Sequence, residues 1–263
     1  MNDEGTLVMN IAISRAAFLD FDGVLFDTVR EAYVISIVAL GRSGRVADID
    51  FNSKYFKKFN QFRYLIGPAW NYYYLTQAID KAITHSVDDL EVEYRKLLNQ
   101  WARGAHRSFE KNFFRARKRL RETDRDYWLS LISPYNLVKN IRGLVSEFRG
   151  QIFLVTTRDR ESVLDILSLH NVEIPESNIF SKNEFMLRKS KANIVQDLIN
   201  QYQIERALFI DDLEEHLVAC EAIENVSTLQ ATWGYVVPEK KEDNSTFLLK
   251  ELGRFLHGEN VWA

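Results

Sequence analysis

The sequence predicts an α/β fold in which a mostly parallel sheet is flanked by helices. Three apolar segments of strand length, 16–19, 151–155 and 207–210, each run directly into acidic or hydroxyl side chains. Amphipathic segments of helical length follow the second strand and precede the third, and this alternation is typical of a parallel sheet. Residues 45–133 are rich in aromatic and basic side chains, which indicates an inserted helical domain.

The first strand leads into the stretch around which the chain is organised, AAFLDFDGVLFDT at residues 16–28. Asp20 and Asp22 follow the strand one residue apart, and ligands of open α/β sheets bind at this end of the strands. Two carboxylates this close raise each other's pKa unless a cation lies between them, and Mg²⁺ is the usual hard cation. The competing interpretation is an exposed turn, because Asp and Gly23 suit turns.

The segments on either side of this stretch are less distinctive. The only order expected in the lead-in is an extra strand at residues 7–13. Residues 30–40 have apolar side chains at helical spacing and predict a helix, which the segment 41–44 interrupts with two glycines.

The insert has two unusual segments. Nine aromatic side chains lie within residues 55–74, in helices that Gly67 and Pro68 are expected to interrupt. The favoured interpretation is the core of a small helical domain. The alternative is that Tyr72 to Tyr74 line a substrate lid, since tyrosine joins an apolar body to a polar tip.

The second segment, residues 103–121, holds eight Lys or Arg and one acid. An apolar stripe and a basic stripe fall on opposite faces of the predicted helix, and the favoured interpretation is a solvated face. The alternative is a positive surface that steers an anionic substrate or contacts nucleic acid. The apolar stripe is Phe109, Phe113, Ala116 and Leu120, and the basic stripe is Arg107, Lys111, Arg115 and Lys118.

From Pro134 onward, strands and helices alternate as in the βα units of a parallel sheet. Helices are predicted at 137–148, 162–169, 191–202, 217–223 and 247–256, and strands at 151–155, 178–180, 207–210 and 226–230. Gly150 follows the first of these helices, as a helix end prefers.

The stretch DFDGVLFDT resembles the first motif of the haloacid dehalogenase-like (HAD) hydrolase superfamily, DxDG(T/V). The resemblance implies that Asp20 is a nucleophile that forms an aspartyl-phosphate and that Asp22 is a general acid and base. The second aspartate resembles the phosphatase and phosphomutase branches. Dehalogenases of the superfamily lack it, so dehalogenation is disfavoured.

The strand FLVTT resembles the second motif of the superfamily, an apolar strand that ends in Thr or Ser. The resemblance implies that Thr156 donates to a phosphoryl oxygen, with Thr157 as the fallback. Gly23 is expected to let the backbone approach the same phosphate. A threonine that caps the following helix is the competing interpretation. Arg158, expected to be exposed, gives only weak support for a substrate contact.

The third motif of the superfamily is a lysine that keeps the nucleophile ionised and neutralises phosphate charge. Lys182, Lys189 and Lys191 all precede the last acidic strand. Lys191 fits best by its distance from the acid pair at the end of that strand, and Lys189 is close behind.

The segment ALFIDDLEEH resembles the fourth, metal-binding motif. Asp212 aligns with the aspartate of the superfamily, and Asp211 is expected to share the Mg²⁺ shell directly or through water. With Asp20 and Asp22 they form the predicted metal ligands. The superfamily often has another acid four residues further on, where this chain has His216.

The resemblance implies a Rossmann-like core of residues 1–29 and 134–263 and a helical type-one cap of residues 30–133. The net charge of −3 does not favour wholesale nucleic-acid binding. The one cysteine, Cys220, allows no internal disulfide and is expected to be packed in the core. No stretch reaches the ~18 apolar residues of a membrane span, and the amino terminus does not resemble a secretory signal. A cytoplasmic protein without membrane partners is predicted.

The expected function is Mg²⁺-dependent hydrolysis of a small phosphorylated metabolite, with Asp20, Asp22, Thr156 and Lys191 as the catalytic set. A phosphomutase shares this core chemistry and is the alternative enzyme. A binding or regulatory protein would keep the fold without turnover. A nucleic-acid end phosphatase would depend on the basic segment alone and is disfavoured. The sequence reveals neither the natural substrate nor the oligomeric state.

Overall fold

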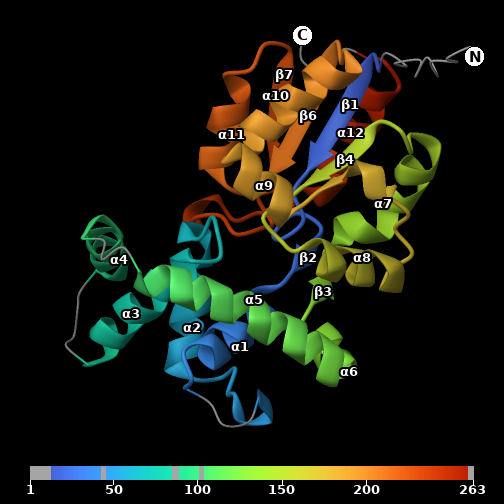
Figure 1. Cartoon of the computed structure of the whole chain (residues 1–263). Helices are drawn as coiled ribbons and strands as arrows, with labels where there is room; N and C mark the ends of the chain where they lie inside the picture. The colour runs from blue at the N-terminus through green and yellow to red at the C-terminus, as the bar shows by residue number, and fades with distance from the viewer. Residues whose placement is uncertain (1–12, 43–45, 85–88, 101–103, 260–263) are drawn as a thin grey trace, which may run out of the picture.

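Figure 1 shows a computed structural model of the chain, which describes residues 13–42, 46–84, 89–100 and 104–259. Five parallel strands form one sheet in the order β5-β4-β1-β6-β7. They are β1 (Arg15–Leu19), β4 (Ile152–Val155), β5 (Ile179–Phe180), β6 (Arg206–Asp211) and β7 (Val226–Gln230). The predicted α/β fold is confirmed, and each of these strands lies within one residue of its predicted bounds. The strand expected at 7–13 falls almost entirely outside the described residues.

The central strand β1 is buried on both faces because its neighbours on each side are strands and both faces carry helices. Ala17 and Leu19 belong to the core on one face, and Ala16 and Phe18 to the core on the other. The first face is covered by α7 (Asn136–Glu147), α8 (Arg160–Leu169) and α12 (Ser245–Leu256), and the second by α10 (Lys191–Tyr202) and α11 (Glu214–Glu221). This two-sided burial explains why the strand is uniformly apolar.

The remaining long helices form a layer below the carboxyl ends of the strands (Figure 1), as expected of an inserted helical cap. They are α1 (Val29–Ala39), α2 (Lys54–Gln61), α3 (Asn71–Thr84), α4 (Leu90–Asn99), α5 (Ala105–Thr123) and α6 (Arg125–Ser130). The chain leaves and re-enters the core through two short antiparallel strands, β2 (Phe26–Asp27) and β3 (Ser133–Pro134). The predicted boundaries between core and cap, after residue 29 and before residue 134, lie beside these two strands and stay a prediction.

Aromatic rings form the core of the helical cap, as the favoured interpretation has it. The Tyr72 ring stacks between Phe59, with centroids 5.2 Å apart, and Phe113, at 5.5 Å. Tyr72 and Tyr74 are buried. The break at Gly67 and Pro68 is also present, because α3 begins only at Asn71.

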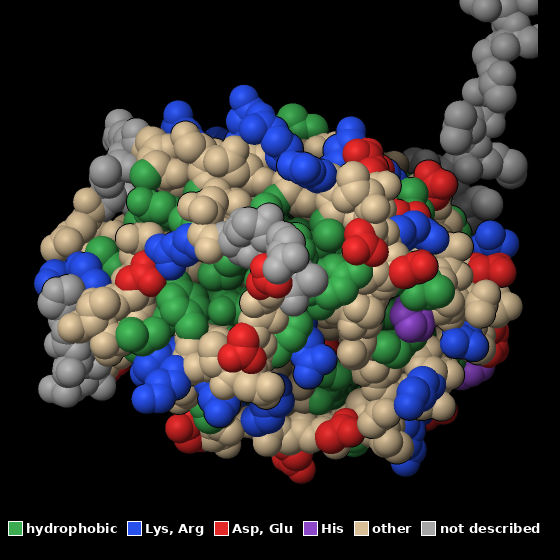
Figure 2. Space-filling model, turned by 90° about the horizontal axis from the view of Figure 1, so that it is seen from below, with side chains coloured by type: hydrophobic (Ala, Val, Ile, Leu, Met, Phe, Trp, Pro, Cys, Tyr) green, Lys and Arg blue, Asp and Glu red, His purple; other side chains and the backbone are tan. Residues whose placement is uncertain are grey.

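Helix α5 presents its basic stripe to solvent and packs Phe109, Phe113 and Leu120 inward. Seen from below, Lys and Arg side chains on the cap are interspersed with acidic and apolar ones (Figure 2). Arg117, a basic side chain of this helix outside the predicted stripe, is buried.

Two helices differ from the sequence prediction. Helix α11 begins at Glu214 rather than at residue 217, because its first turn is acidic and therefore suits the positive end of the helix dipole. Helix α9 (Lys182–Arg188) was not predicted. Its signal is the capping box S-x-x-E, in which the Ser181 amide donates to Glu184 Oε2 at 2.7 Å.

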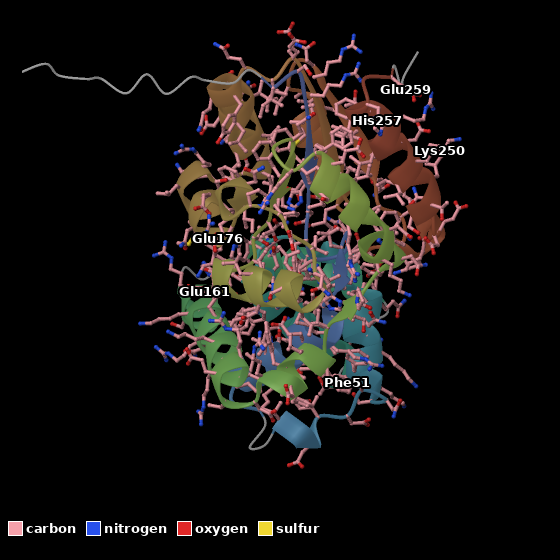
Figure 3. All side chains as sticks on the ribbon, turned by 90° about the vertical axis from the view of Figure 1, so that its right-hand side faces the viewer. Phe51, Glu161, Glu176, Lys250, His257 and Glu259 are labelled. Atoms are coloured by element: carbon pink, nitrogen blue, oxygen red, sulfur yellow. The ribbon has the colours of Figure 1, made fainter. Side chains whose placement is uncertain are left out.

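Helix α12 lies along one face of the sheet, where Leu248 and Leu252 pack into the core. Lys250 on this helix and His257 just after it lie on the side of the core, whereas Phe51 lies in the helical cap (Figure 3). The carboxyl ends of the strands, where the acidic motifs lie, face the helical cap (Figure 1).

Candidate active site

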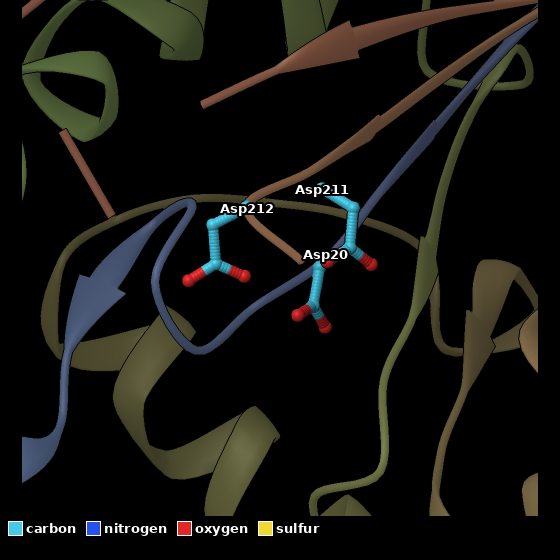
Figure 4. A group of neighbouring side chains, drawn as sticks. All are labelled: Asp20, Asp211 and Asp212. Carbon is cyan, nitrogen blue, oxygen red and sulfur yellow. The ribbon is translucent and has the colours of Figure 1, made fainter. Parts of the chain in front are cut away.

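Three carboxylates meet at the ends of two neighbouring strands. Asp20 follows β1, while Asp211 ends β6 and Asp212 follows it, and the register pairs Leu19 with Ile210. One carboxylate oxygen from each aspartate lies within 4.8 Å of the other two (Figure 4). All three side chains are buried, so the motif is not an exposed turn.

Lys191 is the cation nearest this group. Its Nζ lies 2.8 Å from Asp20 Oδ1 and 2.7 Å from Asp211 Oδ2, and the side chain is 2% exposed. Burial alone would lower the pKa of Lys191, but Asp20 and Asp211 outweigh burial and raise it. The structure thus brings the predicted lysine to the predicted nucleophile, whereas Lys189 is exposed.

The pKa values of the three buried carboxylates shift in different directions, because Lys191 contacts Asp20 and Asp211 and His216 contacts only Asp211. Burial would raise the pKa of Asp211, but Lys191 and His216 outweigh it and lower that pKa. Burial raises the pKa of Asp20 to about 6, with Lys191 opposing and Asp211 reinforcing the shift. Burial, Asp211 and Asp20 together raise the pKa of Asp212 well above its ordinary value.

The geometry of this group tests whether it fits a metal ion. Three buried carboxylates converge, with one oxygen of each within 4.8 Å of the others, and Lys191 is their only close ammonium partner among the described residues. A further cation among them would remove the repulsion, and oxygen-only donors match the preference of Mg²⁺. The side chains of Asp20, Asp211 and Asp212 therefore fit Mg²⁺. The Asp211 carboxylate accepts a hydrogen bond from His216, with Oδ2 lying 3.1 Å from Nδ1.

Two glycines make room for Asp212. A Cβ at Gly23, whose φ is +92°, would lie 1.9 Å from Asp212 Oδ2, and one at Gly234 would lie 2.6 Å from the Asp212 Cβ. The backbone N–H of Tyr235 donates to Asp212 Oδ2 at 2.6 Å. Gly23 is thus needed for the packing of Asp212, and its contact with a phosphate stays a prediction.

Asp22 lies outside the carboxylate group and faces a guanidinium instead. Arg158 Nη1 donates to Asp22 Oδ1 at 2.9 Å. Burial would raise the pKa of Asp22, but Arg158 and then Arg117 outweigh it and hold the pKa below its usual range. Arg158 was expected to be exposed, and this expectation is wrong: the side chain is fully buried and paired with carboxylates.

Thr156 and Thr157 follow β4, next to β1. Thr156 is 1% exposed, and its Oγ1 accepts the backbone N–H of Arg158 at 3.2 Å. Helix α8 is capped by Asp159, whose side chain accepts the Ser162 N–H at 3.1 Å, so the capping interpretation of the threonines is not needed. Thr157 is half-buried and lines a small cavity of about 210 Å³ beside α9.

A larger cavity of about 660 Å³ lies between the cap and the core. Lys191 and Asp212 line it from the core, and Tyr64, Trp70 and Tyr94 line it from the cap. Charged side chains that line this cavity form ion pairs with one another, as in the Arg95–Glu91 pair at 2.6 Å and the Lys240–Glu214 pair at 2.8 Å. Residues 72–74, the alternative lid tyrosines, are not among the described residues that line this cavity.

The cap also contributes a buried cation that the sequence did not indicate. The Arg63 guanidinium lies 4.2 Å from the centroid of the Tyr235 ring, and its Nη1 donates to the Ile66 carbonyl at 2.8 Å. Its Nε has no hydrogen-bond partner among the described residues. Burial lowers the pKa of Arg63, but Tyr72 and Tyr235, followed by Asp212 and Asp22, outweigh burial and raise it. The segment around residue 63 carries no motif that could have predicted this placement.

The overall fold, a parallel α/β core with an inserted helical cap, is similar to that of solved structures described as HAD-like hydrolases and phosphatases. A predicted phosphoglycolate phosphatase from Haemophilus somnus is 14% identical with a TM-score of 0.54, covering 92% of this chain and 98% of its own. A predicted phosphatase from Clostridium acetobutylicum is 12% identical with a TM-score of 0.54, covering 92% and 100%.

A protein from Bacteroides fragilis described as a haloacid dehalogenase-like hydrolase is 15% identical with a TM-score of 0.53, covering 87% of this chain and 91% of its own. At these identities the shared feature is the fold. No family model matches the sequence, and no curated protein sequence matches it significantly. Within the described residues, no helix has the length and apolar character needed to span a membrane.

Proposed function

We propose that this chain is a HAD-like phosphomonoester hydrolase that requires Mg²⁺ and acts on a small phosphorylated metabolite. The observation that carries the proposal is the buried group of Asp20, Asp211 and Asp212 with Lys191 bound to two of them. Such a group concentrates negative charge at the carboxyl end of the sheet. A metal ion bound there would offset that charge and allow a negatively charged phosphate to approach.

In the proposed reaction, an Asp20 oxygen attacks phosphorus and the bond to the leaving oxygen breaks, while Asp22 supplies the proton to that oxygen. Water then attacks the aspartyl-phosphate and gives its proton to Asp22. The bond between phosphorus and Asp20 breaks, which releases inorganic phosphate. The ionised form of Asp22 that Arg158 favours suits this second step.

Other residues of the site would stabilise the charge of the phosphoryl oxygens. Lys191 is already within contact of the nucleophile, and Thr156 ends the neighbouring strand. Mg²⁺ held by Asp20, Asp211 and Asp212 would supply further charge stabilisation. A carboxylate of Asp22 as a fourth ligand is also part of the sequence prediction, although its side chain is engaged by Arg158.

The test is phosphate release from a panel of phosphomonoesters, with Mg²⁺ and with a chelator. We expect release that requires Mg²⁺ and that is lost in Asp20→Asn. Asp165→Asn is the matched control, because Asp165 pairs with Arg121 and Arg125 and not with the site, so it should keep its activity. Turnover of Asp20→Asn at the wild-type rate would refute the proposal. Isomerisation of a sugar phosphate without net release would identify a phosphomutase instead.

A further inference from the structure

A buried network of ion pairs connects Asp22 to the helical cap. All three guanidinium nitrogens of Arg158 donate hydrogen bonds. Nη1 donates to Asp22 Oδ1 at 2.9 Å, Nη2 to Glu31 Oε1 at 3.0 Å, and Nε to Ser162 Oγ at 3.1 Å. The side chains of Arg158 and Glu31 are both fully buried. The hydrogen bonds to Glu31 and Ser162 therefore fix the position of the Nη1 that holds Asp22.

Glu31 lies in the first turn of α1 and collects donors from two further helices of the cap. Arg117 of α5 donates to its two oxygens, with Nε at 2.6 Å and Nη2 at 3.1 Å. Trp128 Nε1 of α6 donates at 3.1 Å. Helices α1 and α5 lie side by side in the cap (Figure 1). Glu31 thus joins Arg158 of the core to the interior of the cap.

A second contact returns from the cap to the core. Arg117 Nη1 donates to Asp159 Oδ2 at 3.1 Å, beside Arg158 in the same turn after β4. Arg117 and Glu31 are buried, whereas Asp159 is partly exposed. Buried charges are tolerated only when they are paired and hydrogen-bonded, so this network has a narrow choice of arrangements. A shift of the cap relative to the core would break these ion pairs or move Arg158 with it.

We propose that Arg158 is a positioning residue that aims the Asp22 carboxylate at the water that hydrolyses the aspartyl-phosphate, and that Glu31 and Arg117 couple this position to closure of the cap. The planar fork of arginine supplies the geometry, because its donors have fixed relative directions. A lysine at 158 would keep the charge but lose the fork. The inference rests on the proposed function.

The test isolates the second step with p-nitrophenyl phosphate, whose leaving phenolate needs no proton from Asp22. Water attack on the intermediate then limits turnover whenever Asp22 is displaced. We expect Arg158→Met, Arg158→Lys and Glu31→Gln to accumulate phosphoenzyme after acid quench and to lose kcat on the order of 10²-fold. Asp22→Asn should give the same accumulation, and KM should fall with kcat in each case.

Arg121→Met is the matched control. Arg121 joins α5 of the cap to Asp165 of α8 at 3.2 Å, so it also links cap and core but does not touch the Asp22 network. It should leave the amount of phosphoenzyme unchanged. Glu31→Gln keeps the shape of the side chain. If Arg158→Met does not fold, the amount of phosphoenzyme in Glu31→Gln still tests the inference.

Two outcomes separate the inference from the proposed function. If Asp22→Asn accumulates phosphoenzyme while Arg158→Lys and Glu31→Gln do not, the positioning role is refuted and the hydrolase remains. If Asp20→Asn turns over like the wild type, the proposed function fails and the inference fails with it.

Discussion

Gly23→Ala tests whether the backbone turn after the first strand is built around Asp212. The new Cβ would lie 1.9 Å from Asp212 Oδ2 and 2.9 Å from Tyr235 Cδ2. Ordinary contacts need about 3.5 Å, so the Asp212 carboxylate or the turn has to move by roughly 1.5 Å. The φ of +92° at this position adds strain for any residue with a Cβ.

The magnitude follows from these two effects. A residue with a side chain at such a φ costs about 1–3 kcal/mol, and overpacking costs about 1–3 kcal/mol more. We therefore expect the free energy of unfolding to fall by about 2–6 kcal/mol. Displacing a carboxylate by roughly 1.5 Å should weaken Mg²⁺ binding by about 10–100-fold and lower turnover by a similar or larger factor.

Urea denaturation measures the first effect, and calorimetric titration with Mg²⁺ together with phosphate release measures the second. Gly143→Ala is the control, because Gly143 is exposed within α7 and its Cβ would meet nothing within 4 Å. That substitution should stabilise the protein by about 0.5–1 kcal/mol. If Gly23→Ala binds Mg²⁺ and turns over like the wild type, the packing argument around Asp212 is refuted.

Two further predictions concern buried charges. Lys191→Met leaves Asp20 and Asp211 without their ammonium partner, so it should lower the free energy of unfolding by about 3–5 kcal/mol, and an unchanged urea midpoint would contradict this. Asp159 has a pKa below its ordinary value, since Arg117 and Arg158 outweigh burial. Its contribution to stability is present above the unfolded pKa of about 4 and is lost as pH falls toward the folded pKa. Asp159→Asn should therefore be less stable at pH 7 and lose less stability than the wild type on acidification, which urea denaturation at several pH values would measure.

Much of the candidate site could be predicted from local sequence. A parallel strand buried on both faces is a short apolar run, and a polar residue at its end is conspicuous, so Asp20, Thr156 and Asp211 could be placed at one edge of a sheet. Lys191 was chosen from three lysines by its distance along the chain, and it is the buried one that pairs with Asp20. These features depend on neighbours in the sequence.

The sequence by itself determined the succession of the five strands along the chain and of most core helices, the polar residues at the strand ends and the aromatic core of the cap. The order of the strands within the sheet came from the tertiary structure. Only the tertiary structure decided which charges are buried together. Arg158 reaches Asp22 across 136 positions and Glu31 across 127, and Arg117 reaches Glu31 across 86. Periodicity records the face of an element on which a residue lies, but an ion pair between distant elements depends on how those elements pack. For that reason the sequence indicated neither the burial of Arg117 nor that of Arg158, which was expected to be exposed, and together they form the buried link between the cap and Asp22.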